Sequence, residues 1–207
     1  TSEVSRCAHV DAAGVVDRYL SEGYTSLVIS NHFNNFTLDH TGSDWKTRVE
    51  HYLNGWRCAV KHAGERMHVL LGAEIRFPEN LNDYLIFGLT EEYLLSHPYL
   101  YELNLRDFSE LAHADGLLVI QAHPFRNGMT VMPPELLDGY EVFNGTVGHH
   151  SRNPIARAWC RMHGKIPTAG SDFHNPDSVA DAGILTDEPI TDMNRLCAVL
   201  RSGDYTL

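Results

Sequence analysis

The sequence is poor in basic residues. It has 16 Lys and Arg against 27 Asp and Glu in 207 residues, which gives a formal net charge of −11 at pH 7. Tight binding to a phosphate backbone needs clustered cations that displace counterions. The composition therefore argues against a partner as large as a long nucleic acid, although it still allows a short or mononucleotide substrate.

Cysteines and long apolar runs are also scarce. The four cysteines have no paired short spacing, so the sequence predicts neither a zinc ribbon nor a disulfide framework: they are Cys7, Cys58, Cys160 and Cys197. A reducing, cytoplasmic location is the resulting expectation. No apolar run approaches the ~20 residues that a membrane-spanning helix needs, and residues 1–6 lack the apolar stretch of a secretory signal. We therefore expect no membrane partner.

Helical and strand-like segments alternate along the chain. Asp11, Asp44 and Asn104 are placed to cap amphipathic helices, and Pro154 suits the first turn of another. Short apolar runs follow or separate these helices at 26–30, 67–71, 84–89, 117–121, 140–143, 166–169 and 183–185, and a closing helix is expected at 191–200. This alternation predicts an α/β protein with right-handed crossovers and a parallel barrel, in one domain over residues 1–207. An open doubly wound sheet is the alternative.

Imidazole and carboxylate side chains follow the apolar runs. His32, Glu74 and His123 each come shortly after one, and Asp172 and His174 come after another. In a parallel barrel the loops at the carboxyl ends of the strands converge on one face. Nitrogen and carboxylate ligands suit a borderline divalent metal. We therefore predict that these five residues bind metal in one pocket.

Local backbone geometry favours metal binding by the sharpest of these motifs. In an extended segment Asp172 and His174 would point to the same face and reach one metal or two adjacent metals. Pro124 is expected to hold His123 in an extended conformation. Taken singly, each residue also has a structural explanation, and Glu74 could be a salt-bridge partner of Arg76. The metal hypothesis depends on their joint placement.

Two arginines are candidates for substrate binding. Arg126 comes three residues after His123, and Arg76 comes two residues after Glu74. A guanidinium matches a phosphate group in bidentate geometry. Both are therefore expected to hold a phosphate near the metals, with an ordinary ion pair to an acidic residue as the alternative for each.

The ordered motifs resemble those of the polymerase and histidinol phosphatase (PHP) superfamily over nearly the whole chain. They are Ile29-Ser30-Asn31-His32, Gly72-Ala73-Glu74, Ala122-His123-Pro124, Glu141-Val142-Phe143-Asn144 and Gly170-Ser171-Asp172-Phe173-His174. The resemblance implies a distorted (β/α)7 TIM-like barrel that carries two or three zinc, manganese or iron ions at its strand ends. It also implies hydrolytic activity on phosphate esters.

The chain departs from the family pattern at three places. The family's opening His-x-His is absent, so the first strand that carries it is expected to be missing from this sequence. Asn31 stands where the family usually has Asp, and no histidine follows the run at 84–89. We therefore expect two metals, with three as the alternative. Cys7 falls near the family's next ligand position, where a thiolate would bind zinc or iron well, although a structural thiol is the alternative.

These observations together predict a metal-dependent phosphoesterase that hydrolyses a small phosphate ester with a metal-activated water. Asp172, His174, Arg126 and Arg76 are the expected catalytic residues, and His174 or a second water is the expected proton donor. One alternative is a metal-dependent nuclease or nucleotide phosphodiesterase. Another is a degenerate barrel that binds metal without catalysis. The sequence leaves the ester, the metal and the oligomeric state open.

Overall fold

Two short parallel strands and a mixed six-stranded sheet form the centre of the protein in a computed structural model, which describes residues 1–42 and 44–207. The first pair is β1 (Ser26–Ile29) and β3 (His68–Leu71). The larger sheet has the order β2-β4-β5-β6-β7-β8. Its strands are β2 (His32–Phe33), β4 (Ala73–Ile75), β5 (Tyr84–Phe87), β6 (Leu118–Gln121), β7 (Gly139–Asn144) and β8 (Ile166–Gly170).

The two sheets follow one another along the chain, since β1 leads into β2 and β3 leads into β4. The strands are interrupted at residues 30–31, between β1 and β2, and at Gly72, between β3 and β4. The buried hydroxyl of Tyr52 contacts the backbone at both interruptions, because it lies 2.6 Å from the carbonyl oxygen of Gly72 and 3.3 Å from that of Asn31. A side chain at Gly72 would collide with Val28, because a Cβ there would lie 2.7 Å from the Cγ1 atom of Val28. Beyond these two interruptions β2 pairs with β4, so the residues that follow β1 and β3 lie close together.

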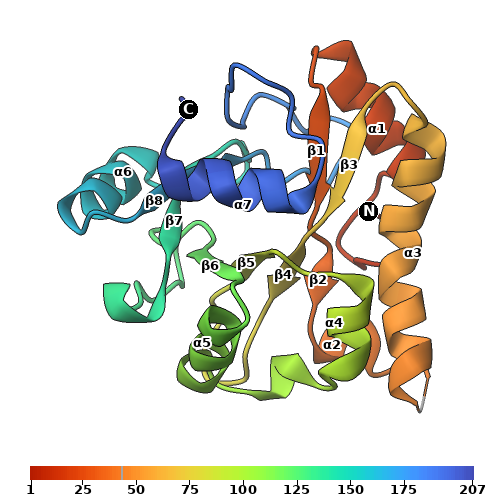
Figure 1. The fold of residues 1–207 in the computed structure, drawn as a ribbon, viewed down its shortest axis with the longest axis horizontal. Helices are drawn as coiled ribbons and strands as arrows, with labels where there is room; N and C mark the ends of the chain where they lie inside the picture. Colours follow the sequence, from red (N-terminus) through yellow and green to blue (C-terminus); the bar gives the residue numbers. More distant parts are fainter. Residues whose placement is uncertain (43) are drawn as a thin grey trace.

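The helices surround these strands (Figure 1). They are α1 (Ala12–Ser21), α2 (Asn35–Leu38), α3 (Trp45–Ala63), α4 (Glu91–Ser96), α5 (Leu105–Ala114), α6 (Asn153–Met162) and α7 (Met193–Ser202), with 3-10 turns at Leu100–Glu102 and Pro134–Leu136. Helix α7 lies across the space between the β1/β3 pair and the strands β7 and β8 (Figure 1). The predicted caps are confirmed, because the side chains of Asp11, Asp44 and Asn104 each accept a hydrogen bond from the backbone of the first turn. Among the described residues, no helix combines the length and the apolarity needed to cross a bilayer.

The structure confirms the α/β class and parallel pairing of β1 with β3, β2 with β4, β6 with β7, and β7 with β8. One strand differs from the expected parallel arrangement: β5 runs antiparallel to both β4 and β6. The hydrogen-bonded order of the described strands does not close into a ring. The exact (β/α)7 barrel therefore stays a prediction. The strand expected at 183–185 is also corrected, since only Leu185 forms an isolated bridge, with Thr206.

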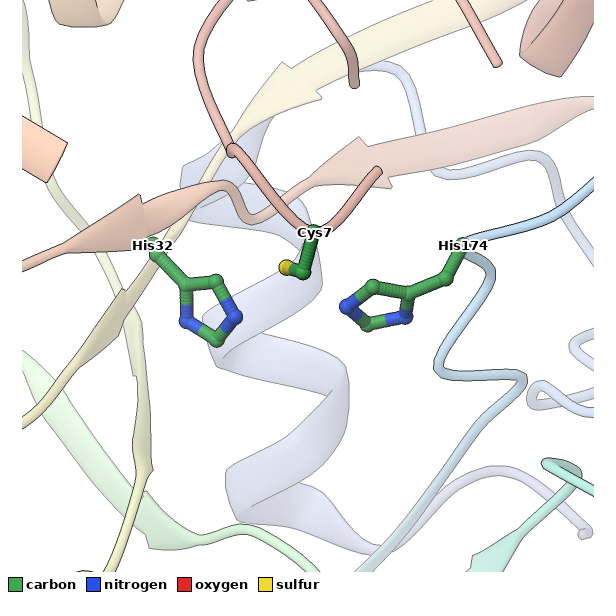
Figure 2. Close-up of side chains that lie close together, drawn as sticks. All are labelled: Cys7, His32 and His174. Atoms are coloured by element: carbon green, nitrogen blue, oxygen red, sulfur yellow. The ribbon is translucent and has the colours of Figure 1, made fainter. Parts of the chain in front are cut away.

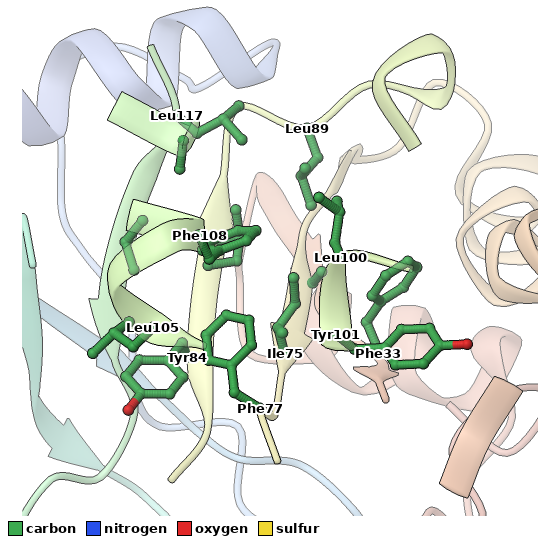
Figure 3. Packing of buried hydrophobic residues seen from close by; sticks show 14 of the residues in the cluster. Phe33, Ile75, Phe77, Tyr84, Leu89, Leu100, Tyr101, Leu105, Phe108 and Leu117 are labelled. Atoms are coloured by element: carbon green, nitrogen blue, oxygen red, sulfur yellow. The ribbon is translucent and has the colours of Figure 1, made fainter. Parts of the chain in front are cut away.

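The main apolar core lies between the larger sheet and helices on both sides of β5 in the sequence, among them α3 and α5. Figure 3 shows side chains of β4, β5, α5 and the first 3-10 turn facing one another, with Phe77 and Phe108 between them. The rings of Phe77 and Phe108 are 5.1 Å apart, and Phe108 has no exposed surface. Truncating such a ring to alanine costs about 3–5 kcal/mol. This packing fixes the strands that carry the polar residues described next.

Candidate metal centre

His32 and Glu74 are neighbours across the pairing of β2 with β4. The Nδ1 atom of His32 lies 3.4 Å from Oε2 of Glu74, and both side chains are mostly buried. Parallel strands place residues of matching register side by side, so the strand breaks after β1 and β3 account for this contact. The two residues were expected in one pocket, and the structure brings them together.

Asp83 and His123 extend this pair. His123 Nε2 lies 3.6 Å from Oε1 of Glu74 and 3.8 Å from Oδ2 of Asp83. Asp83 directly precedes β5, and because β5 is antiparallel its amino end lies at the edge where the parallel strands end. A parallel strand would have its site residue after Leu89, so the sequence pattern did not indicate Asp83.

The guanidinium of Arg76 is held by Asp83. Its Nε and Nη2 atoms donate to the two carboxylate oxygens at 2.8 Å and 2.7 Å. The ion-pair alternative is therefore the arrangement that the structure shows for Arg76, although the partner is Asp83 and not Glu74. Its role as a phosphate-binding residue, expected from the sequence, would require this bidentate pair to open.

His123 and Asp172 have backbone conformations that non-glycine residues rarely adopt. Their φ angles are +29° and +49°, so both expectations of an extended backbone are wrong. Glu141 and Asn144 stabilise these conformations: Oε2 of Glu141 accepts from the backbone N–H of His123 at 2.8 Å, and the Asn144 amide donates to Glu141 at 3.0 Å and to Asp172 at 3.3 Å. Tertiary hydrogen bonds here override the local preference set by Pro124.

The carboxylate of Asp172 faces two cationic side chains. Oδ1 of Asp172 lies 3.2 Å from Nδ1 of His174, and Oδ2 lies 3.8 Å from Nη1 of Arg126. The same His174 nitrogen is 2.8 Å from the carbonyl oxygen of Asp172. Arg126 is three-quarters buried and has its guanidinium beside the cluster. The structure thus places Asp172, His174 and Arg126 together, as expected.

Cys7 joins the cluster from the segment that precedes α1. Figure 2 shows its thiol between the rings of His32 and His174, which point toward one another. One ligand atom from each of these three residues lies within 4.8 Å of the others. A second set with the same property consists of His32, Glu74 and Asp83. Among the described residues, these are the groups close enough to hold a metal ion.

The charges of these groups shift one another's pKa. Burial lowers the pKa of His32, but the carboxylate of Glu74 and the thiol of Cys7 more than offset burial and raise it to about 9. The hydrogen bond to Asp172 raises the pKa of His174 to about 11, and Cys7 contributes. For Cys7, burial acts to raise the pKa, yet hydrogen bonds to the two imidazoles lower it to about 6. Without metal, the cluster is therefore a set of opposite charges near neutral pH.

A cavity of about 820 Å³ opens beside the cluster. Its lining includes His32, Glu74, His123, Asp172 and His174, together with apolar residues of β1, β5 and α7. Five of the predicted metal-binding residues therefore share one hollow. A cavity of this size accommodates a small molecule.

The donor set fits a divalent metal. The Nδ1 atom of His32, which faces Glu74 in the cluster, is buried and has no hydrogen-bond partner among the described residues. Burying an unsatisfied polar atom costs free energy, and an imidazole nitrogen that lacks a hydrogen bond is available as a metal ligand. Imidazoles, carboxylates and one thiol are ligands typical of zinc and iron, and carboxylates also suit manganese.

Comparison with known proteins relates the chain to the PHP superfamily. Residues 150–205, which include α6, β8 and α7, match the PHP-associated family. A search of curated protein sequences gave no match. Over these residues, which include Asp172 and His174, the match confirms the resemblance predicted from the motifs.

Three solved structures share the fold. A two-domain protein from Bacteroides vulgatus containing a predicted PHP-like metal-dependent phosphoesterase is 18% identical, with a TM-score of 0.61, over 82% of this chain and 49% of that chain. PsfC from Pseudomonas syringae is 15% identical, with a TM-score of 0.56, over 82% and 75% of the two chains. An amidohydrolase from Chromobacterium violaceum with bound sulfate and no metal is 16% identical, with a TM-score of 0.52, over 93% and 92%. The chain spans about half the length of the Bacteroides protein.

Proposed function

We propose that this protein is a metal-dependent hydrolase that cleaves phosphate esters of small molecules. The observation that carries the proposal is the meeting of His32, Glu74, His123 and Asp172 in the lining of one cavity, with Arg126 beside Asp172. Metal ligands next to a guanidinium are the elements that hydrolysis of a phosphate ester requires. The superfamily resemblance and the PHP-like structural neighbour support the same reaction class.

His32, Glu74, His123, Asp172 and His174 would hold the metal, with zinc, manganese and iron as the candidates and two ions as the expected number. Bound divalent ions would supply Lewis acidity and lower the pKa of a coordinated water toward neutrality. Asp83 lies within reach of His32 and Glu74 and extends the expected ligand set. Glu141 and Asn144 keep His123 and Asp172 in the conformations that direct them to this point.

Arg126 is the stronger of the two candidates for holding the phosphate. Its Nη1 atom lies 3.8 Å from Asp172, a distance longer than a hydrogen bond, so the guanidinium can turn toward an incoming anion. Arg76 is committed to Asp83 through two short hydrogen bonds. We therefore assign the non-bridging phosphate oxygens to Arg126 and assign to Arg76 the positioning of Asp83.

His174 fits the role of ligand better than that of general acid. A nitrogen that binds a metal must be unprotonated, so an imidazole that serves as a ligand cannot give a proton from that atom to the leaving oxygen. The ring of His174 shares a metal-sized space with His32 and Cys7. Under this assignment a water, as the sequence-based hypothesis allowed, protonates the leaving oxygen.

The proposal can be tested with a panel of phosphomonoesters and phosphodiesters. Protein supplied with Zn²⁺ or Mn²⁺ is expected to release phosphate from at least one monoester. Asp172→Ala should lower kcat/KM by more than the ~10–100-fold that loss of an outer-shell partner of a metal ligand costs. Asp204→Ala, at an exposed carboxylate, is the matched control.

Two results would contradict the proposal. One is a failure of the metal-supplied wild type to cleave any ester, and the other is equal activity of wild type and Asp172→Ala. Cleavage of diesters alone would favour the nucleotide phosphodiesterase alternative. The net charge of −11 makes long nucleic acids poor substrates in either case.

A further inference from the structure

The segment that carries Cys7 is hydrogen-bonded to the backbone of both His32 and His174. Two residues before Cys7, the hydroxyl of Ser5 accepts a hydrogen bond from the backbone N–H of His32 at 3.0 Å. Two residues after it, the backbone N–H of His9 donates to the carbonyl oxygen of His174 at 2.7 Å. These two hydrogen bonds, one on each side of Cys7 in the sequence, hold Cys7 between the two rings, as Figure 2 shows.

The environment of Cys7 differs from that of the structural cysteines. Cys160 and Cys197 are buried and belong to apolar clusters, and the Cys160 thiol donates to the carbonyl oxygen of Lys165 at 3.1 Å. Cys7 is exposed and lies outside the apolar clusters found among the described residues. Packing therefore does not account for the position of this thiol.

We propose that Cys7 is a thiolate ligand, with His32 and His174, and that its sulfur makes the centre prefer zinc, iron(II) or cobalt(II) to manganese or magnesium. The inference rests on the proposed function, since it assumes that the cluster holds metal. One sulfur and two imidazole nitrogens form a donor set that zinc favours, whereas manganese and magnesium favour oxygen. The ligand atoms of the three residues already lie within 4.8 Å of one another.

The neighbouring group provides an internal contrast. His32, Glu74 and Asp83 offer one nitrogen and two carboxylates, a harder set that suits manganese as well as zinc. His32 belongs to both groups, so the preference for a softer metal depends on Cys7 and not on the imidazoles. Replacing the sulfur with a carboxylate should therefore change which metal is preferred while a centre is still formed.

Cobalt(II) provides a direct readout, because a thiolate bound to cobalt gives an intense charge-transfer absorption in the near ultraviolet that imidazole and carboxylate ligands do not give. Metal-free protein would be titrated with Co²⁺ as wild type, Cys7→Ser, Cys7→Asp and Cys58→Ser. Cys58 is a half-buried thiol on α3, outside the metal-sized groups, and is the matched control. Competition titrations would give the relative affinities for Zn²⁺ and Mn²⁺.

We expect the charge-transfer band in wild type and Cys58→Ser and its loss in both Cys7 variants. Cys7→Ser should weaken zinc binding by more than ~10–100-fold, and Cys7→Asp should raise the ratio of manganese to zinc affinity by about tenfold. Circular dichroism would establish that the variants are folded, and Cys7→Asp keeps the test valid if Cys7→Ser does not fold.

The possible failures are distinguishable. Cobalt binding to wild type with ligand-field bands but without the charge-transfer band would overturn the role of Cys7 and leave the metal centre standing. A band that persists in folded Cys7→Asp would likewise overturn it. No cobalt binding to wild type would overturn both this inference and the proposed function.

Discussion

At the scale of single residues, the candidate centre is assembled from side chains that conflict with their own local preferences. His123 and Asp172 have positive φ angles, which cost of order 1–3 kcal/mol each in non-glycine residues. Glu141 offsets part of this cost through its hydrogen bonds to the backbone of His123 and to Asn144. The buried carboxylate of Glu141 thus helps to orient His123 directly and Asp172 through Asn144. Its ionisation should therefore affect the stability of the protein.

The stability of the metal-free protein is expected to depend on the ionisation of Glu141. Burial raises the pKa of Glu141 from 4.5 to about 7, and the charge of Asp172 adds to this effect. A carboxyl group whose folded pKa is raised binds its proton more tightly in the folded state, so its contribution to stability is lost as pH rises from 4.5 to about 7. The loss is on the order of 3 kcal/mol.

This prediction is checked by urea unfolding between pH 4 and pH 8 on metal-free Glu141→Gln and wild type, with Glu135→Gln as an exposed control. Because Gln does not ionise, the free energy of unfolding of Glu141→Gln should gain on that of wild type as pH rises. Glu135→Gln should follow wild type. A difference between Glu141→Gln and wild type that does not vary with pH would refute the assignment.

At the scale of secondary-structure elements, the short connection before β5 decides where one site residue lies. Only residues 76–83 separate β4 from β5, whereas a parallel crossover needs a dozen residues or more. That length alone predicts an antiparallel strand, and with it a site position for Asp83. The alternation of helices and strands correctly predicted the caps at Asp11, Asp44 and Asn104, but the same rhythm wrongly implied that every strand is parallel.

Whether another site residue could be predicted depends on whether the sequence around it sets its position or a contact with a distant segment does. His32, Glu74 and His123 could be predicted because each follows an apolar strand in the sequence. The pairing of Arg76 with Asp83 and the support of Asp172 by Asn144 are contacts between side chains of different segments. Strand periodicity does not specify them, since a pattern of apolar residues fixes which face a residue takes and not which partner it meets.

The loop after β6 yields a prediction of its own. The guanidinium of Arg152 donates to the carbonyl oxygen of Phe125 and to Oδ1 of Asn127, both at 2.6 Å, and so holds the residues on either side of Arg126. Arg152→Ala should raise KM for a phosphate ester by up to about tenfold, because hydrogen bonds from a charged group are worth about 1.5–3 kcal/mol and part of this orders the loop. The value of kcat should change little, since the metal ligands are untouched.

Steady-state kinetics on three variants would check the role of Arg152. Arg152→Lys keeps the charge and should recover part of the affinity, and Arg157→Ala, on the exposed side of α6, should behave as wild type. If KM is unchanged in Arg152→Ala, or if kcat falls as far as KM rises, the residue does not act by positioning Arg126.

At the scale of the whole molecule, acidic charge is concentrated where the strands meet. Glu74, Asp83, Glu141 and Asp172 are all mostly buried at one end of the fold, in a chain whose net charge is already −11. Carboxylates held close together in a low-dielectric interior raise the free energy of the folded state unless cations compensate them. The imidazoles and Arg76 supply part of this compensation.

A divalent metal should therefore stabilise the folded protein. A ligand that binds only the folded state adds about 2.7 kcal/mol at a concentration of 100 times its Kd, which corresponds to a rise in Tm of roughly 5–10 °C for a domain of this size. Zn²⁺ added to chelator-treated protein should produce this shift, and a chelator should reverse it. Glu74→Gln should abolish most of the shift, because this carboxylate contacts both His32 and His123. Asp204→Asn, which changes the net charge equally at an exposed position, should keep the shift; equal shifts in both variants would mean that zinc acts through the overall charge and not through this centre.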